Sequence, residues 1–205
     1  MTQIEIGRLL RAATGGFVVG CRVTQVEAPS FGALLRVPLE GDYHVYGLIH
    51  DIHVDDDGLV RQLVTAEGID DAIIADNRVN RNVPLEMSVL AVGYRQGGHI
   101  SHLLPPRPPL SLDAIYLCDS SEICQFTAPY GETPRFGYFR HILRAKELPV
   151  GELLAAHIQQ AQQAHAAAGD TTWINLATQE LITLLRDDYP LLMAVLGALS
   201  DMTGD

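Results

Sequence analysis

Lysine is nearly absent from this 205-residue chain, and cysteine and long apolar runs are scarce as well. Lys146 is the only lysine, and no glycine-rich turn precedes it, which excludes the phosphate-holding lysine of a P-loop ATPase. Cys21, Cys118 and Cys124 are too few for a disulfide framework or a four-thiolate zinc site. We therefore expect three free thiols, buried or half-buried, and no P-loop hydrolysis.

Apolar runs are too short for a membrane span, which requires ~18 consecutive residues. The most apolar tract, Leu191–Leu199, is far shorter, and the amino terminus carries neither the basic stretch nor the apolar core of a secretion signal. Because 47% of the residues are apolar and 19% are charged, these absences predict a globular protein without a membrane span, located in the cytoplasm.

Positive charge is also in short supply, since 25 acidic side chains face 14 basic ones and the formal net charge is −11. The arginines are scattered singly, whereas phosphate binding depends on clustered Lys and Arg that release counterions. Direct nucleic-acid binding is therefore disfavoured. The expected partner is another protein or a further copy of the chain.

The first part of the chain, residues 1–104, has β-branched and apolar runs bounded by Gly, Pro, Asn and Asp. About five to seven short strands at this spacing predict a closed antiparallel β-barrel, because closure removes the exposed edges of a small sheet. One interruption, at residues 68–79, has the spacing of a short helix.

Four prolines at residues 105–109 end this pattern, since proline disfavours both helix and central strand. We interpret residues 105–118 as a proline-rich connector and an exit strand; a ligand for a proline-recognising module is the alternative. Residues 119–205 then predict a helical domain, with a helix through residues 153–168, a second capped by Asp170 or Thr171 and a third starting at Tyr189. The fold class is α+β, a small antiparallel barrel followed by helices.

A histidine and aspartate window offers the best metal candidates, His53, Asp55 and Asp57. His50 and His53 are separated by an odd number of residues, which places them on opposite faces of a strand, and the aspartate run before Gly58 is typical of a hairpin loop. These three residues therefore stay weak candidates. No catalytic residue and no cofactor is expected, because Cys118 or Cys124 would need a histidine that the sequence cannot place.

Aromatic residues gather after Pro134, where three rings fall within four positions. Internal packing and a protein-contact patch are both open interpretations of this cluster. The predicted partner contacts are Phe136, Tyr138, Phe139 and Trp173.

Several segments together resemble the HAS barrel, the amino-terminal module of HerA-type DNA translocases and of the catalytic-ring subunits of ATP synthase. They are Ile6-Gly7-Arg8-Leu9, Phe17-Val18-Val19, Val45-Tyr46-Gly47-Leu48-Ile49 and Val89-Leu90-Ala91-Val92-Gly93-Tyr94, followed by the proline run and Leu112-Asp113-Ala114-Ile115-Tyr116. The resemblance covers about residues 4–118. It implies a role in contact, because in the family these barrels crown a hexameric ring and in HerA help dock a nuclease. No nucleotide or magnesium ligand is carried over, since helices stand where the family has its ATPase core.

The sequence thus predicts a non-catalytic interaction or assembly factor, a stand-alone barrel adaptor that oligomerises or docks on a ring ATPase or a nuclease. Two alternatives stay open. One is a small metal-dependent hydrolase or nuclease-like accessory enzyme that uses the aspartates of residues 51–57. The other is a barrel that binds single-stranded nucleic acid on a strand face.

Overall fold

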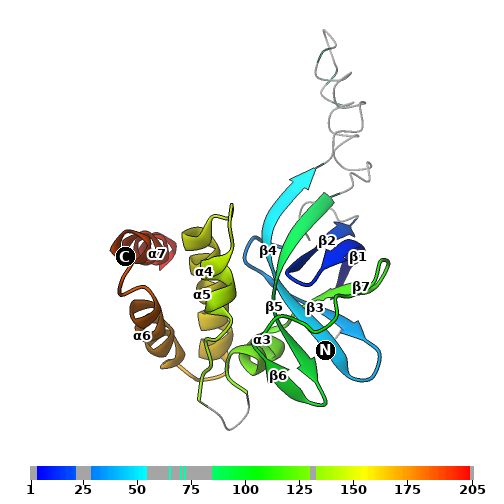
Figure 1. The fold of residues 1–205 in the computed structure, drawn as a ribbon. Coiled ribbons are helices and arrows are strands. Elements are labelled where there is room, and N and C mark those ends of the chain that lie inside the picture. Colours follow the sequence, from blue (N-terminus) through cyan, green and yellow to red (C-terminus); the bar gives the residue numbers. More distant parts are fainter. Residues whose placement is uncertain are drawn as a thin grey trace.

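The computed structural model describes residues 4–21, 29–54, 65, 70, 72, 85–129 and 133–203. It consists of a β-barrel with helices stacked against one side (Figure 1). The expected α+β class, an antiparallel barrel followed by helices, is confirmed. The short helix expected at residues 68–79 falls on a stretch of which only residues 70 and 72 are described.

The sheet has seven strands in the order β2-β1-β7-β3-β4-β5-β6, with antiparallel pairing throughout. A further pairing between β2 and β5 closes six of them into a barrel, so that β6 remains as an extra strand on β5. Closure leaves the six barrel strands without an unpaired edge. The strands are β1 (Ile4–Ala13), β2 (Gly16–Cys21), β3 (Leu34–Leu39), β4 (Tyr43–Val54), β5 (Leu85–Gln96), β6 (His99–Ser101) and β7 (Ala114–Leu117).

β7 corrects the domain boundary expected at residue 104. This strand pairs with both β1 and β3, so it completes the barrel wall instead of leaving it. The proline run is held against the barrel, since Pro105 and Pro109 are buried and the Tyr43 hydroxyl of β4 donates to the Arg107 carbonyl at 2.9 Å. A strand of four residues gives almost no periodic signal, which is why the sequence did not assign it to the barrel.

The carboxy-terminal helices are found where the periodicity predicts them. The N-cap residue of one of them, α6, is Thr172, where Asp170 or Thr171 was expected; the Asp170 Oδ1 still accepts hydrogen bonds from the backbone N–H groups of Thr172, at 2.9 Å, and Trp173, at 3.3 Å. Asp119 and Glu122 form a capping box on the first helix. The helices are α3 (Ser120–Thr127), α4 (Phe139–Arg144), α5 (Val150–Ala167), α6 (Trp173–Leu184) and α7 (Tyr189–Thr203).

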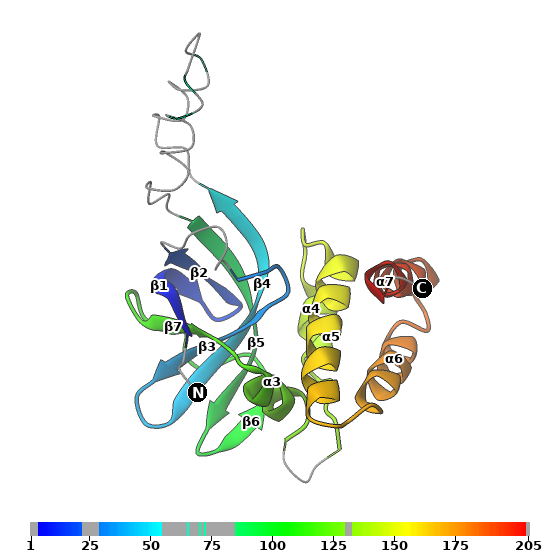
Figure 2. The same cartoon turned by 180° about the vertical axis from the view of Figure 1, so that it is seen from behind.

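Two hydrophobic cores share the barrel wall. Among the described residues, the interior is filled from the strands and from Ala33 just before β3, with buried side chains such as Leu9, Val19 and Val37. The outer face turns Tyr46 and Leu48 toward the helices, where they join a second core that reaches α7. Helices α4 and α5 lie next to the barrel, and α6 and α7 lie beyond them, farthest from it (Figures 1 and 2). The helical region therefore packs on the barrel as part of one fold.

Candidate functional site

The four aromatic side chains predicted as partner contacts lie inside this second core. Phe136 is 9% exposed, and Tyr138, Phe139 and Trp173 are completely buried. Ring centroids are 4.8 Å apart for Tyr138 and Phe139, and 5.6 Å apart for Phe136 and Trp173. Of the two interpretations, internal packing is the one the structure shows. A contact patch at these residues is wrong, because their rings offer a partner almost no surface.

The weak metal candidates are only partly within the described residues. His53 is described and half-exposed, with ring nitrogens 3.8 Å from an Asp51 carboxylate oxygen and 3.9 Å from one of Glu86. Asp55 and Asp57 lie outside the described residues. Across the part of the chain that is described, no three His, Cys, Asp or Glu side chains are grouped so as to hold a metal ion.

Thr127, His165 and Asp170 are arranged in the order of a catalytic triad, which the sequence did not suggest. His165 Nε2 lies 2.8 Å from the Thr127 hydroxyl, and its Nδ1 lies 3.5 Å from Asp170 Oδ2. Thr127 is completely buried, and its hydroxyl donates to the Ile123 carbonyl at 2.9 Å, so a substrate has no access to it. The array instead joins the ends of α3 and α5.

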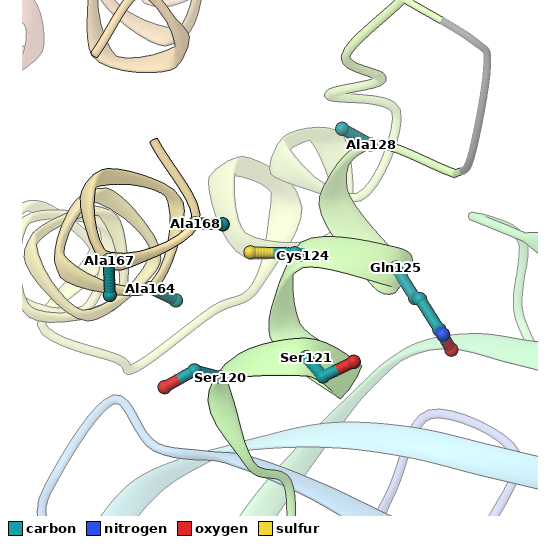
Figure 3. Close-up of a pocket in the computed structure, with 8 residues that line it drawn as sticks. All are labelled: Ser120, Ser121, Cys124, Gln125, Ala128, Ala164, Ala167 and Ala168. Atoms are coloured by element: carbon teal, nitrogen blue, oxygen red, sulfur yellow. The ribbon is translucent and has the colours of Figure 1, made fainter. Parts of the chain in front are cut away.

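A pocket of about 340 Å³ lies beside this array, between α3 and the end of α5 (Figure 3). The Cys124 sulfur points across it toward Ala168. Burial, assisted by the Asp170 carboxylate, raises the pKa of the Cys124 thiol, so it is not an activated nucleophile at neutral pH. The other lining residues are uncharged: Ser120, Ser121, Gln125, Ala128, Ala164 and Ala167.

A buried arginine fastens the barrel to the helices. Arg36 Nε on β3 donates to Glu122 Oε1 at 2.7 Å, and its guanidinium lies 5.5 Å from the centre of the Tyr116 ring. His44 lies between Arg36 and Arg95, and burial together with these two cations lowers its pKa. Sequence reasoning missed this cluster. Its signal is a lone arginine within the apolar strand Leu34-Leu35-Arg36-Val37, which needs a partner when buried.

Helix α7 carries apolar surface that nothing in the described chain covers. Tyr189 is 67% exposed and Met193 48%, and with the exposed Gly197 they recur at every fourth residue, which places them on one side of the helix. We call Tyr189, Met193 and Gly197 the α7 strip. Asp188 caps the start of the helix, where its Oδ1 accepts from Leu191 N at 3.1 Å, and the exposed Asp201 lies near its end.

A second exposed apolar feature lies in the turn Leu110–Asp113, just before β7. Leu110 and Leu112 are each 72% exposed, although the backbone is held firmly. Asp113 N donates to Leu110 O at 3.1 Å, and Leu112 N donates to Leu9 O at 2.8 Å. Leu112 has φ +73°, at a turn position where glycine or asparagine is usual, and for leucine this costs about 1 kcal/mol. We call this segment the leucine turn.

No protein-family model and no curated protein sequence matches this chain. None of the helices in the described ranges has the length and apolar character to cross a bilayer. The functional conclusion therefore depends on the residues themselves. The α7 strip and the leucine turn are apolar features that packing among the described residues does not explain.

Proposed function

We propose that this chain is a non-catalytic protein-interaction or assembly factor, in which a barrel and its helical layer present surfaces to other protein subunits. The carrying observation is the α7 strip, with Tyr189 67% and Met193 48% exposed on a helix at the outer edge of the molecule. Apolar side chains aligned on one side of a helix are typical of surfaces that bury against a partner.

The polar clusters support the same proposal. The Thr127, His165 and Asp170 array is buried between two helices, and Arg36 is held by Glu122 and Tyr116 at the joint between barrel and helices. Each of these groups has a partner that explains its position structurally. Their arrangement leaves the exposed apolar side chains as the better candidates for function.

The resemblance to the HAS barrel supplies a possible setting, a crown on a ring ATPase or a docking platform for a nuclease. The closed six-strand antiparallel barrel is compatible with that setting. Support from the barrel is general, because small barrels serve many functions and the site decides between them. We therefore propose that the chain contacts its partner through its helices.

The test compares the wild-type chain with Met193→Asp in solution mass and in capture of purified candidate partners. We expect the wild type to associate with itself or with a partner, and Met193→Asp to weaken that association at least tenfold. The matched control is Gln179→Asp, which adds the same charge at an exposed position of α6. A wild-type chain that stays monomeric and captures no partner contradicts the proposal.

A further inference from the structure

His44 lies where the barrel meets the helices, with a guanidinium group on each side of its ring. Arg36 Nη1 is 3.3 Å from its Nδ1, and Arg95 Nη2 is 2.8 Å from its Nε2. His44 and Arg95 are cross-strand partners on β4 and β5, and Arg36 belongs to the adjacent strand β3. We propose that uptake of a proton by His44 loosens helix α3 from the barrel, so that this junction is an acid-sensitive switch. The switch is separate from the proposed function, because it involves neither the α7 strip nor a partner.

The ring of His44 can accept a hydrogen bond only while it is neutral. A neutral imidazole has one nitrogen with a free lone pair, whereas an imidazolium has two N–H groups and accepts nothing. Guanidinium groups only donate, so the neutral ring accepts from one of the two arginines. In either tautomer, protonation removes that acceptor and places a third positive charge between the two guanidinium groups.

Two carboxylates balance the two arginines while His44 is neutral. Glu122 of α3 accepts from Arg36 Nε at 2.7 Å, and Asp42, in the turn before β4, accepts from Arg95. Asp42 Oδ1 also lies 3.3 Å from His44 Nε2, which favours the protonated ring. Burial, followed by the two arginines, outweighs Asp42 and lowers the pKa of His44 below its ordinary value of 6.5. The proton is therefore taken up only in acid, and it leaves one positive charge of the cluster without a carboxylate.

Arg36 cannot move away from the added charge, whereas Arg95 can. The Arg95 side chain is 29% exposed and can turn toward solvent. The Arg36 side chain is 5% exposed and lies against the Tyr116 ring of β7, and its Nη2 has no hydrogen-bond partner among the described residues. The added repulsion therefore acts on the contact between Arg36 and Glu122, which holds the first turn of α3 on the barrel.

Two buried cysteines distinguish a movement of α3 from an opening of the barrel. Cys118 immediately precedes α3, is 5% exposed, and donates through its backbone N–H to Leu34 O at 3.0 Å. A shift of α3 away from β3 uncovers this thiol. Cys21 is also 5% exposed but belongs to the core inside the barrel. The reactivity of Cys118 therefore reports on the junction, and that of Cys21 on the barrel interior.

The test labels the thiols of the whole chain with 4,4′-dithiodipyridine, which reacts in acid as well as at neutral pH. Mass spectrometry locates the labelled cysteines, and each rate is divided by that of free cysteine at the same pH. Between pH 7.5 and pH 5, the Cys118 rate should rise by at least about tenfold, because the open state takes up the His44 proton more readily. At pH 5 it should exceed the Cys21 rate. An NMR titration of the His44 ring should have the same midpoint as the rise in Cys118 labelling.

Two variants identify the group that takes up the proton. His44→Gln stays neutral at both pH values and still offers an oxygen acceptor to an arginine, so it should reduce the rise in the Cys118 rate by about tenfold. Arg95→Gln removes one of the flanking cations and should move both midpoints to higher pH. Arg140→Gln, which removes an exposed cation of α4, is the matched control for Arg95→Gln and should leave the midpoints in place.

Three results would overturn the proposal. Equal labelling rates of Cys118 and Cys21 at pH 5 would show that acid opens the whole chain instead of the junction. A His44→Gln variant with the pH profile of the wild type would show that another group takes up the proton. An Arg95→Gln variant whose midpoints stay in place or move to lower pH would also exclude His44, and this measurement decides the matter if His44→Gln does not fold.

Discussion

The inner and outer faces of the barrel wall are packed in different ways. Inside, the buried side chains of the described residues come from the strands and from Ala33 just before β3, and they include the rings of Phe17 and Tyr43 among mostly aliphatic groups. Outside, Tyr46 and Leu48 are covered by aromatic rings of the helical region, with Phe126 centred 5.0 Å from Tyr46. The difference teaches that the interior can be built by the strands, whereas the outer face remains apolar and exposed until the helices cover it.

The largest expected effect is on the outer core. Phe139→Ala removes a completely buried ring between barrel and helices and should lower the free energy of unfolding by about 3–5 kcal/mol. Unfolding should remain a single transition, because the two cores share the barrel wall. Trp173 is the only tryptophan and lies in the helical layer, so its fluorescence can be compared with circular dichroism of the whole chain. Two separated transitions would show instead that the helices are an independent unit.

The next largest effect on stability is expected at the ion pair between Arg36 and Glu122, which links the barrel to the helices. Glu122→Ala leaves the Arg36 guanidinium buried without its carboxylate and should cost about 3 kcal/mol in a denaturant titration. Replacing both partners, by Arg36→Met and Glu122→Leu together, should recover most of that loss. Glu152→Ala, at an exposed position of α5, is the control and should change stability by less than about 0.5 kcal/mol. A similar loss of stability in Glu122→Ala and in Glu152→Ala would mean that the buried Arg36–Glu122 pair contributes no more to stability than an exposed glutamate does.

Buried histidines make the outer core sensitive to acid. Burial lowers the pKa of His102 and of His157 to about 4, below the ordinary value of 6.5. The unfolded chain therefore takes up these protons first, and stability is lost as pH falls from about 6.5 toward 4, by about 2 kcal/mol for each histidine at pH 5.

Unfolding free energies at pH 7.5 and pH 5 check this expectation. The difference between them should shrink in His157→Gln, which removes one of the two buried imidazoles whose pKa is lowered. An equal pH dependence in His157→Gln and the wild type would show that His157 does not titrate as its burial demands.

The smallest expected change in stability is at Gly197 in the α7 strip, which is uncovered, unlike the two hydrophobic cores. Gly197→Ala should raise stability by up to about 1 kcal/mol, because alanine favours the helix and its Cβ meets no neighbour. Gly169→Ala is the opposite case, since φ is +89° there and alanine is strained, so the melting temperature should fall. A destabilising Gly197→Ala would mean that the strip is already covered within the chain.

Local pattern was enough for much of the fold. Alternating apolar residues predict most of the strands, and apolar spacing of three and four with caps such as Asp170 predicts α5, α6 and α7. The same reasoning failed for β7, because four residues carry too little pattern to reveal their pairing. It also left open whether the aromatic residues around Tyr138 are buried or contact a partner, since the sequence alone does not distinguish these two cases.

Three features were therefore determined by the sequence alone: the element types, the acidic balance and the absence of a P-loop lysine. The tertiary structure decided which apolar side chains are left uncovered. Trp173 and Tyr138 are buried, whereas Met193 and Leu110 are not, although all four belong to segments with apolar character. The physical reason is that burial depends on contacts between residues far apart in the chain, and local periodicity contains no information about those contacts.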